Sequence, residues 1–165
     1  MVRKRGEDPN RLPDIYARTI NAALKEKPAD MTITTHVCRG NFRSTWISEG
    51  GYEPVAELLL GGVAYDGYFL EYDTERAGGL EPLRFLPKGN KRAVVGLVTS
   101  KSGNLEKKDD IKRRLDEAAR FAPIEQLCLS PQCGFASTEE GNILEEDQQW
   151  AKLRMIVDIA GEVWR

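Results

Sequence analysis

The sequence predicts an α/β fold made of parallel βα units. Four short runs rich in β-branched and apolar residues are expected to be strands, and they recur about 30 residues apart, a spacing typical of parallel βα units. One of them, RAVVGLVT over residues 92–99, is almost continuously apolar, as expected for a strand covered on both faces. The length of 165 residues, with 41% hydrophobic and 30% charged residues, fits one globular domain spanning residues 1–165.

Helical periodicity and Pro or Gly boundaries place the remaining elements. Pro28 follows the first helix, Pro54 suits the first turn of the second, and Gly61-Gly62 closes it. The predicted order is a helix over 13–26, a strand over 31–38, a helix over 53–60, a strand over 68–73, a loop, a strand over 92–99, a helix over 107–121, a strand over 126–130 and a helix over 145–164.

Apolar residues at helical spacing predict which face of the last helix is buried. This stripe comprises Trp150, Leu153, Val157, Ala160 and Trp164. Together with Trp46, the tryptophans Trp150 and Trp164 are expected to be packing anchors.

The βα rhythm allows either an open doubly wound sheet or part of a (β/α)8 barrel. A complete barrel needs about 250 residues and eight strands. Because only four strands are predicted here, this chain would form half of a barrel if its fold is a barrel.

Charge and motif content exclude several functions. Lys plus Arg total 24 against 26 for Asp plus Glu, so the net charge of -2 favours neither a nucleic acid partner nor an anionic membrane. No run approaches the length of a membrane span, and residues 1–8, MVRKRGED, lack the apolar core of a signal peptide, so we expect a cytoplasmic protein. Dinucleotide, phosphate-loop and nucleophile-elbow motifs are absent, and the charged run over residues 101–108 is expected to be solvated.

Cysteine and histidine are scarce, and two of them are close together. The cysteines are Cys38, Cys128 and Cys133, and the only histidine, His36, lies two residues from Cys38. Three cysteines cannot all pair, and a reducing cytosol makes disulfides unnecessary. Cys128 alternates with leucines inside a predicted strand and is therefore expected in the core.

Potential metal ligands follow three of the predicted strands. His36 and Cys38 end the first strand, Glu71 lies at the end of the second, and Cys133 follows the fourth. In parallel α/β folds the carboxyl ends of strands meet on one face, and thiolates with imidazole and carboxylate favour zinc. Taken singly, each residue also fits a structural role, and Asp73 is as good a candidate as Glu71.

Arg39 and Asn41 directly follow the His-Xaa-Cys pair. They could orient a ligand or bind a substrate carboxylate, but their loop position favours solvated side chains.

Three motifs resemble the catalytic domain of cobalamin-independent methionine synthase. They are THVCRGNF over residues 35–42, YFLEYD over 68–73 and LSPQCG over 129–134. The resemblance is greatest to short bacterial relatives without the enzyme's N-terminal domain, and it covers nearly the whole chain. It implies that the fold is the C-terminal half of a TIM (β/α)8 barrel.

The resemblance also implies a site and a reaction. It assigns zinc to His36, Cys38, Glu71 and Cys133, and so selects Glu71 over Asp73. The family transfers a methyl group from methyltetrahydrofolate, usually polyglutamylated, to homocysteine. The homocysteine sulfur would occupy an exchangeable zinc position, for example by displacing Glu71. Where full-length members of the family have a histidine near the end of the strand corresponding to residues 94–99, this chain has Thr99-Ser100-Lys101.

Two alternatives to a methionine synthase unit stay open at this point. One is a related zinc enzyme of the epoxyalkane to coenzyme M transferase type, and the other is a truncated zinc-binding product without turnover. Because a half barrel exposes strand edges and one side of its core, we also expect the chain to pair with a second copy or an upstream half-barrel chain, or to be poorly stable.

Overall fold

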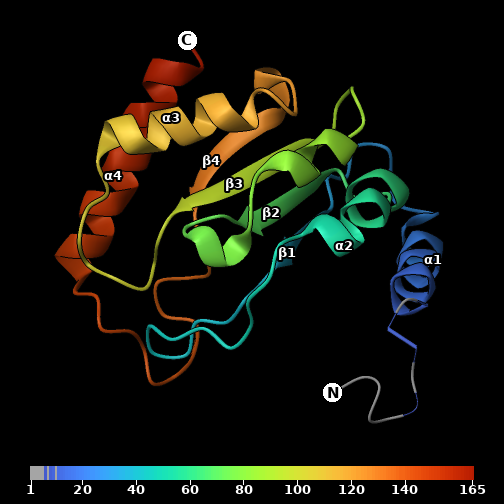
Figure 1. Cartoon of the computed structure of the whole chain (residues 1–165), viewed down its shortest axis with the longest axis horizontal. Helices are drawn as coiled ribbons and strands as arrows, with labels where there is room; N and C mark the ends of the chain where they lie inside the picture. The colour runs from blue at the N-terminus through green and yellow to red at the C-terminus, as the bar shows by residue number, and fades with distance from the viewer. Residues whose placement is uncertain (1–5, 7, 10) are drawn as a thin grey trace.

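A four-stranded parallel sheet forms the centre of the computed structural model, which describes residues 6, 8–9 and 11–165 (Figure 1). Its strands lie side by side in chain order. They are β1 (Thr34–Val37), β2 (Gly67–Glu71), β3 (Arg92–Val98) and β4 (Leu127–Pro131). The predicted α/β class with parallel βα units is confirmed. The charged leader over residues 1–8 falls largely outside the described residues.

The predicted helices are present with small changes in their bounds. They are α1 (Leu12–Leu24), α2 (Glu53–Ala56), which continues as a π-helix over Glu57–Gly62, α3 (Lys108–Ala118) and α4 (Glu146–Val163). The predicted loop between β2 and β3 contains two 3-10 helices, Glu75–Ala77 and Glu81–Phe85. This segment covers the sheet with Leu80 and Leu83, which are fully buried. None of the described helices combines the length and hydropathy that a membrane span requires.

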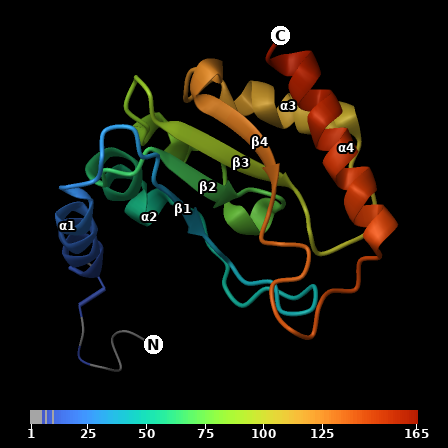
Figure 2. The same cartoon turned by 180° about the vertical axis from the view of Figure 1, so that it is seen from behind.

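The two ends of the sheet are flanked by different helices. Figure 2 shows α4 beside β4 at one end and α1 beyond β1 at the other. α3 packs against both β3 and α4. Strands β1 and β4 are the edges of this sheet, so each has one side without a strand partner among the described residues.

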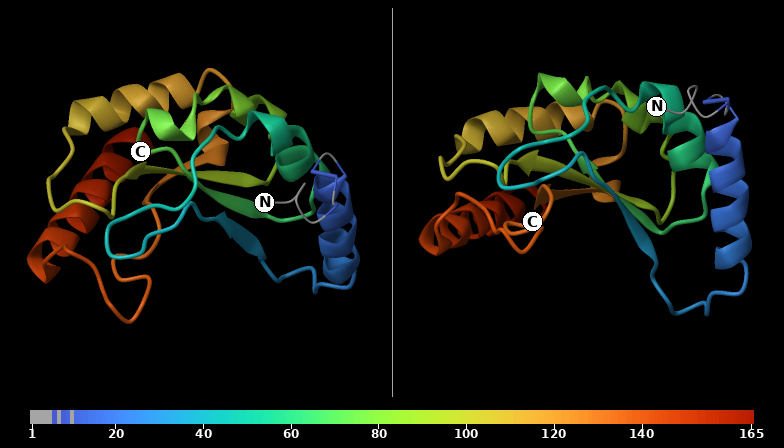
Figure 3. Two further views of the ribbon diagram at one scale, coloured as in Figure 1. Left: turned by 60° about the horizontal axis from the view of Figure 1, so that its bottom comes forward. Right: turned by 90° about the horizontal axis from the view of Figure 1, so that it is seen from below.

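One face of the sheet carries a row of side chains in register. His36, Phe69, Val94 and Cys128 pair successively across the four strands and therefore point to the same face. Phe69 is 37% exposed although its strand is central. Figure 3 shows α2 and α3 on the opposite side of the sheet. One side of the core is thus open to solvent, as a half barrel requires.

The prediction that Cys128 belongs to the core was wrong. Its side chain is only half-buried. The reason is that Cys128 lies on the edge strand β4 and points to the open face, in the same row as Phe69. Alternation with leucines identified the strand but not which face of it is covered.

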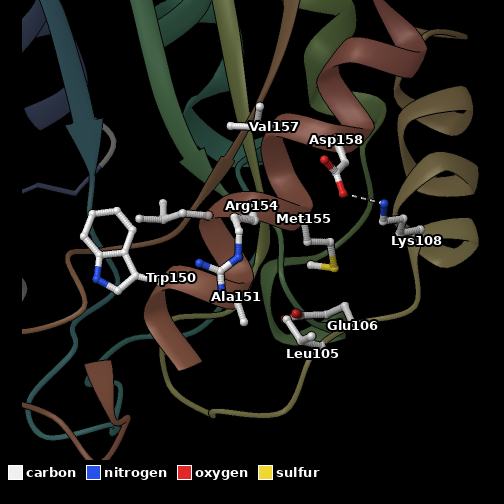
Figure 4. Close-up of a pocket in the computed structure, with 10 residues that line it drawn as sticks. Leu105, Glu106, Lys108, Trp150, Ala151, Arg154, Met155, Val157 and Asp158 are labelled. Atoms are coloured by element: carbon white, nitrogen blue, oxygen red, sulfur yellow. Dashed lines mark hydrogen bonds and ion pairs between the residues drawn. The ribbon is translucent and has the colours of Figure 1, made fainter. Parts of the chain in front are cut away.

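The predicted buried face of α4 was wrong for Trp150 and Val157. Trp150 and Val157 are 50% and 69% exposed and line an open surface pocket of about 650 Å³. Figure 4 shows both side chains pointing away from Lys108 of α3, which also lines this pocket. Residues Lys152, Met155, Ile156 and Ile159 are buried instead. Of the expected tryptophan anchors, Trp46 is also half-exposed, whereas Trp164 packs on the core and donates its indole N–H to the Ile124 carbonyl over 2.9 Å.

A buried lysine explains the orientation of α4. The Lys152 ammonium donates to the Asn104 carbonyl at 2.6 Å and to Glu106 Oε2 at 2.8 Å. The other Glu106 oxygen accepts the Thr99 N–H at 2.8 Å. Lys152 therefore ties α4 to the loop between β3 and α3.

Replacing Lys152 with methionine is expected to lower the free energy of unfolding by about 2 kcal/mol, because the Asn104 carbonyl and Glu106 lose their partner. Urea denaturation measures this change. Lys108→Met is the matched control, because it removes only an exposed ion pair with Asp158 and should change the free energy of unfolding little. Equal losses in the two variants would contradict the role of Lys152.

Candidate metal centre

Three strands bring four possible ligand side chains together at the carboxyl-terminal end of the sheet. His36 lies in β1, Cys38 directly follows that strand, Glu71 ends β2, and Cys133 lies two residues beyond β4. Because the strands are parallel, their carboxyl ends all lie at this end of the sheet. All four residues that the sequence singled out are therefore close together.

One donor atom from each side chain lies within 4.8 Å of the others. Cys133 Sγ is 2.6 Å from Glu71 Oε1, 3.0 Å from Cys38 Sγ and 3.7 Å from His36 Nε2. His36 Nε2 is 3.4 Å from Glu71 Oε1. All three cysteines of the chain are free thiols.

The cluster is closed on one side and open on the other. Glu71 is fully buried and Cys133 is 5% exposed. The His36 side chain is 39% exposed, and Cys38 is also exposed. Glu71 and Cys133 would contact a bound ion from the buried side. A substrate would reach the ion from the solvent side, past His36 and Cys38.

Glu71 is a carboxylate in this environment. Burial raises its pKa, but hydrogen bonds with His36 and Cys133 and the charge of Lys101 outweigh that effect and lower the pKa to about 2. His36 donates this hydrogen bond to the Glu71 carboxylate, which raises the pKa of His36. The pair thus favours an anionic Glu71 beside a protonated His36 in the absence of a cation.

The two thiols of the cluster have opposite pKa shifts. Burial raises the pKa of Cys38, but hydrogen bonds from Cys133 and the Gly40 N–H lower it overall. Burial and then the Glu71 carboxylate raise the pKa of Cys133. Cys133 therefore keeps its proton until a cation replaces it.

The structure separates the two acidic candidates of β2 and the loop after it. Glu71 points into the cluster, whereas Asp73 pairs with Arg76 at 3.1 Å. Only Glu71 thus joins His36 and the two cysteines.

The expectation that Arg39 and Asn41 are solvated was wrong, because they are only 6% and 5% exposed. The Arg39 guanidinium lies 4.5 Å from the centre of the Tyr52 ring and donates to the Gly50 carbonyl, while its backbone N–H donates to Glu71 Oε1 at 3.3 Å. Asn41 donates to the Gly134 carbonyl at 2.8 Å. These contacts fold the loop after β1 against the loop after β4.

Gly40 allows the chain to turn directly beside Cys38. Its φ of +94° is in the left-handed region, and a Cβ atom there would lie 2.9 Å from the Ile47 nitrogen. The turn brings the Ile47 and Ser48 N–H groups to the Arg39 carbonyl.

Three residues around Glu71 were not expected there from the sequence. Lys101, expected to be solvated, has a side chain that is only 8% exposed and donates to Gln132 Oε1 at 2.8 Å. The Tyr52 hydroxyl accepts the Glu71 N–H at 2.8 Å and so holds the end of β2. Lys101 and Gln132 follow β3 and β4, so the strand-end rule that located Cys133 could have found them.

No family model matches the chain. Two curated relatives from Bacillus subtilis are named only as uncharacterized proteins: YxjH is 60% identical over 165 residues, and YxjG is 56% identical over 160 residues. The chain spans 44% and 42% of their lengths.

Solved structures show which proteins share the fold of this chain. A Listeria monocytogenes protein, proposed to be a vitamin-B12-independent methionine synthase, matches 97% of this chain with a TM-score of 0.76 and 43% identity. The chain resembles vitamin-B12-independent methionine synthases in structure. It covers 43% of the Listeria chain. A methionine synthase from Shewanella, at 19% identity and a TM-score of 0.72, shares the fold with 93% of this chain.

Proposed function

We propose that residues 1–165 form one partial catalytic domain, the zinc-binding C-terminal half of a cobalamin-independent methionine synthase barrel. His36, Cys38, Glu71 and Cys133 hold the zinc ion. The observation that carries this proposal is that their donor atoms lie within 4.8 Å of one another at the carboxyl-terminal end of the sheet.

The residues present fit a zinc ion. Two thiols, one imidazole and one carboxylate make a four-ligand set of the kinds zinc prefers, and sulfur selects zinc over magnesium or calcium. The buried Glu71 carboxylate lies 2.6 Å from Cys133 Sγ. When Cys133 and Cys38 lose their protons, three anions share this small volume, and a cation between them relieves their repulsion.

The proposed reaction moves a methyl group from 5-methyltetrahydropteroyl(tri)glutamate to homocysteine. The homocysteine sulfur forms a bond to the methyl carbon, and the bond from that carbon to N5 of the folate breaks. The electron pair of the broken bond stays on N5, which takes up a proton, and the products are methionine and tetrahydrofolate. The likeness to the Listeria protein at 43% identity supports this choice of reaction.

Zinc would supply a lowered thiol pKa, so that homocysteine reacts as a thiolate at neutral pH. The chain's own residues supply the geometry. Glu71 and Cys133 close the inner side of the cluster, and the exposure of His36 and Cys38 leaves the other side accessible to a substrate thiol. The Arg39 N–H and the Tyr52 hydroxyl hold Glu71 in place.

Methyl transfer is tested with the chain fused to the part of Bacillus subtilis YxjH that it does not match. We expect methionine to form from homocysteine and the methylated folate, and no methionine from the Cys133→Ser variant. Coenzyme M is offered as a competing acceptor. Faster alkylation of coenzyme M would favour the related alkyl transferase, and stoichiometric zinc without any transfer would favour a zinc-binding product without turnover.

The proposal predicts that the chain associates. Strands β1 and β4 each have one side without a strand partner in the described part of the chain, and the apolar side chains of Phe69, Trp150 and Val157 are exposed. We expect a second copy or an upstream half-barrel chain to cover them. We place the protein in the cytoplasm, where reducing conditions keep the thiols free. Analytical ultracentrifugation with thermal melting tests this, and a monomer with a high, cooperative melting transition would contradict it.

A further inference from the structure

Lys101 reaches the metal centre from the loop that follows β3. Its side chain is 8% exposed, and its ammonium lies 3.8 Å from Glu71 Oε2. Gln132 Oε1 accepts from the same ammonium at 2.8 Å, and Gln132 directly precedes Cys133 in the chain. A cation is thus held in place behind the buried carboxylate.

The two oxygens of Glu71 have different surroundings. Oε1 faces Cys133 Sγ, His36 Nε2 and the Arg39 N–H. Oε2 is buried and has no hydrogen-bond partner, although Lys101 is near. A buried carboxylate oxygen without a partner is costly, so a small movement of Lys101 toward Oε2 is favourable.

The positive charge of Lys101 lies beside a cluster that is negative when its thiols are deprotonated. Two thiolates and one carboxylate around Zn²⁺ leave one net negative charge, and a substrate thiolate adds a second. Arg39 reaches Glu71 only through its backbone N–H, because its guanidinium is engaged with Gly50 and the Tyr52 ring. Lys101 is therefore placed to offset the charge that an incoming thiolate brings.

We propose that Lys101 is a positioning residue that holds Oε2 of Glu71 away from the metal. Glu71 then binds through Oε1 alone, as a weak and replaceable ligand, and a coordination position stays available to a substrate thiol. Gln132 fixes the lysine for this purpose. The inference rests on the proposed zinc site and adds what keeps that site open to substrate.

Two affinities with opposite expected changes test the role of Lys101. In Lys101→Met, removal of a positive charge strengthens metal binding, whereas binding of the thiolate anion weakens. We expect roughly a tenfold change in each direction, as for the loss of one partly screened unit-charge interaction. A lysine with a merely structural role would weaken both affinities together.

The experiment uses Co²⁺ as a spectroscopic substitute for zinc, with homocysteine as the thiol. Absorption titrations give the Co²⁺ affinity, the coordination number and the appearance of a new sulfur-to-cobalt band. Lys101→Arg, which keeps the charge, should stay close to the unsubstituted chain. Lys107→Met removes an exposed lysine from the same loop and should change nothing.

The outcomes separate this inference from the proposed function. An unsubstituted chain that binds no Co²⁺ would overturn the metal site itself. Normal Co²⁺ and homocysteine binding in the unsubstituted chain, with both affinities unchanged or both reduced in Lys101→Met, would overturn only the role of Lys101.

Discussion

Replacing Cys133 with serine is expected to abolish zinc binding. Cys133 Sγ is the most central donor of the cluster, with Glu71, Cys38 and His36 all within 3.7 Å. Substitutions of residues that merely support metal ligands cost about 10- to 100-fold in affinity, so loss of a buried thiolate ligand should cost at least about 100-fold. Elemental analysis after gel filtration should then find one zinc per unsubstituted chain and almost none in the variant.

The third cysteine provides the matched control for this prediction. Cys128 lies in β4 outside the cluster, so Cys128→Ser should retain its zinc. Cys38→Ser should lose zinc as Cys133→Ser does. Full zinc content in both the Cys38 and Cys133 variants would contradict the metal centre.

Zinc affinity is expected to increase steeply with pH between about 6 and 8. Burial and Glu71 raise the pKa of Cys133, and Glu71 raises the pKa of His36, so both groups hold protons that zinc must displace. Glu71, with a pKa of about 2, has no proton to release in this range. Each proton that zinc displaces corresponds to roughly a tenfold gain in affinity per pH unit.

The direction of the His36 effect follows from its raised pKa. As pH falls through that pKa, His36 takes up a proton and its nitrogen can no longer bind zinc, so affinity declines at a higher pH than for an ordinary histidine. Calorimetric titrations in buffers with different ionisation enthalpies count the released protons. An affinity that is constant from pH 6 to 8 would contradict thiol and imidazole ligands.

The ligand cluster could be predicted from the sequence because it depends on local signals. The strands are visible as apolar and β-branched runs, and the parallel rhythm places their carboxyl ends together. Composition alone did not separate Glu71 from Asp73. The family motif selected Glu71, and the structure places Asp73 against Arg76 instead.

Burial of polar side chains could not be predicted because it depends on partners far along the chain. Lys152 is buried by residues 46 and 48 positions away, and with this face of α4 buried, Trp150 and Val157 lie exposed. Lys101 is buried by Gln132, 31 residues away. Neither contact leaves a periodic signal in the sequence.

X-ray absorption at the zinc edge of the zinc-loaded chain tests whether His36, Cys38, Glu71 and Cys133 bind one zinc ion. We expect two sulfur ligands at about 2.3 Å and two nitrogen or oxygen ligands at about 2.0–2.2 Å. Addition of homocysteine should raise the number of sulfur ligands to three. A zinc spectrum with only nitrogen and oxygen ligands would show that Cys38 and Cys133 do not bind the ion.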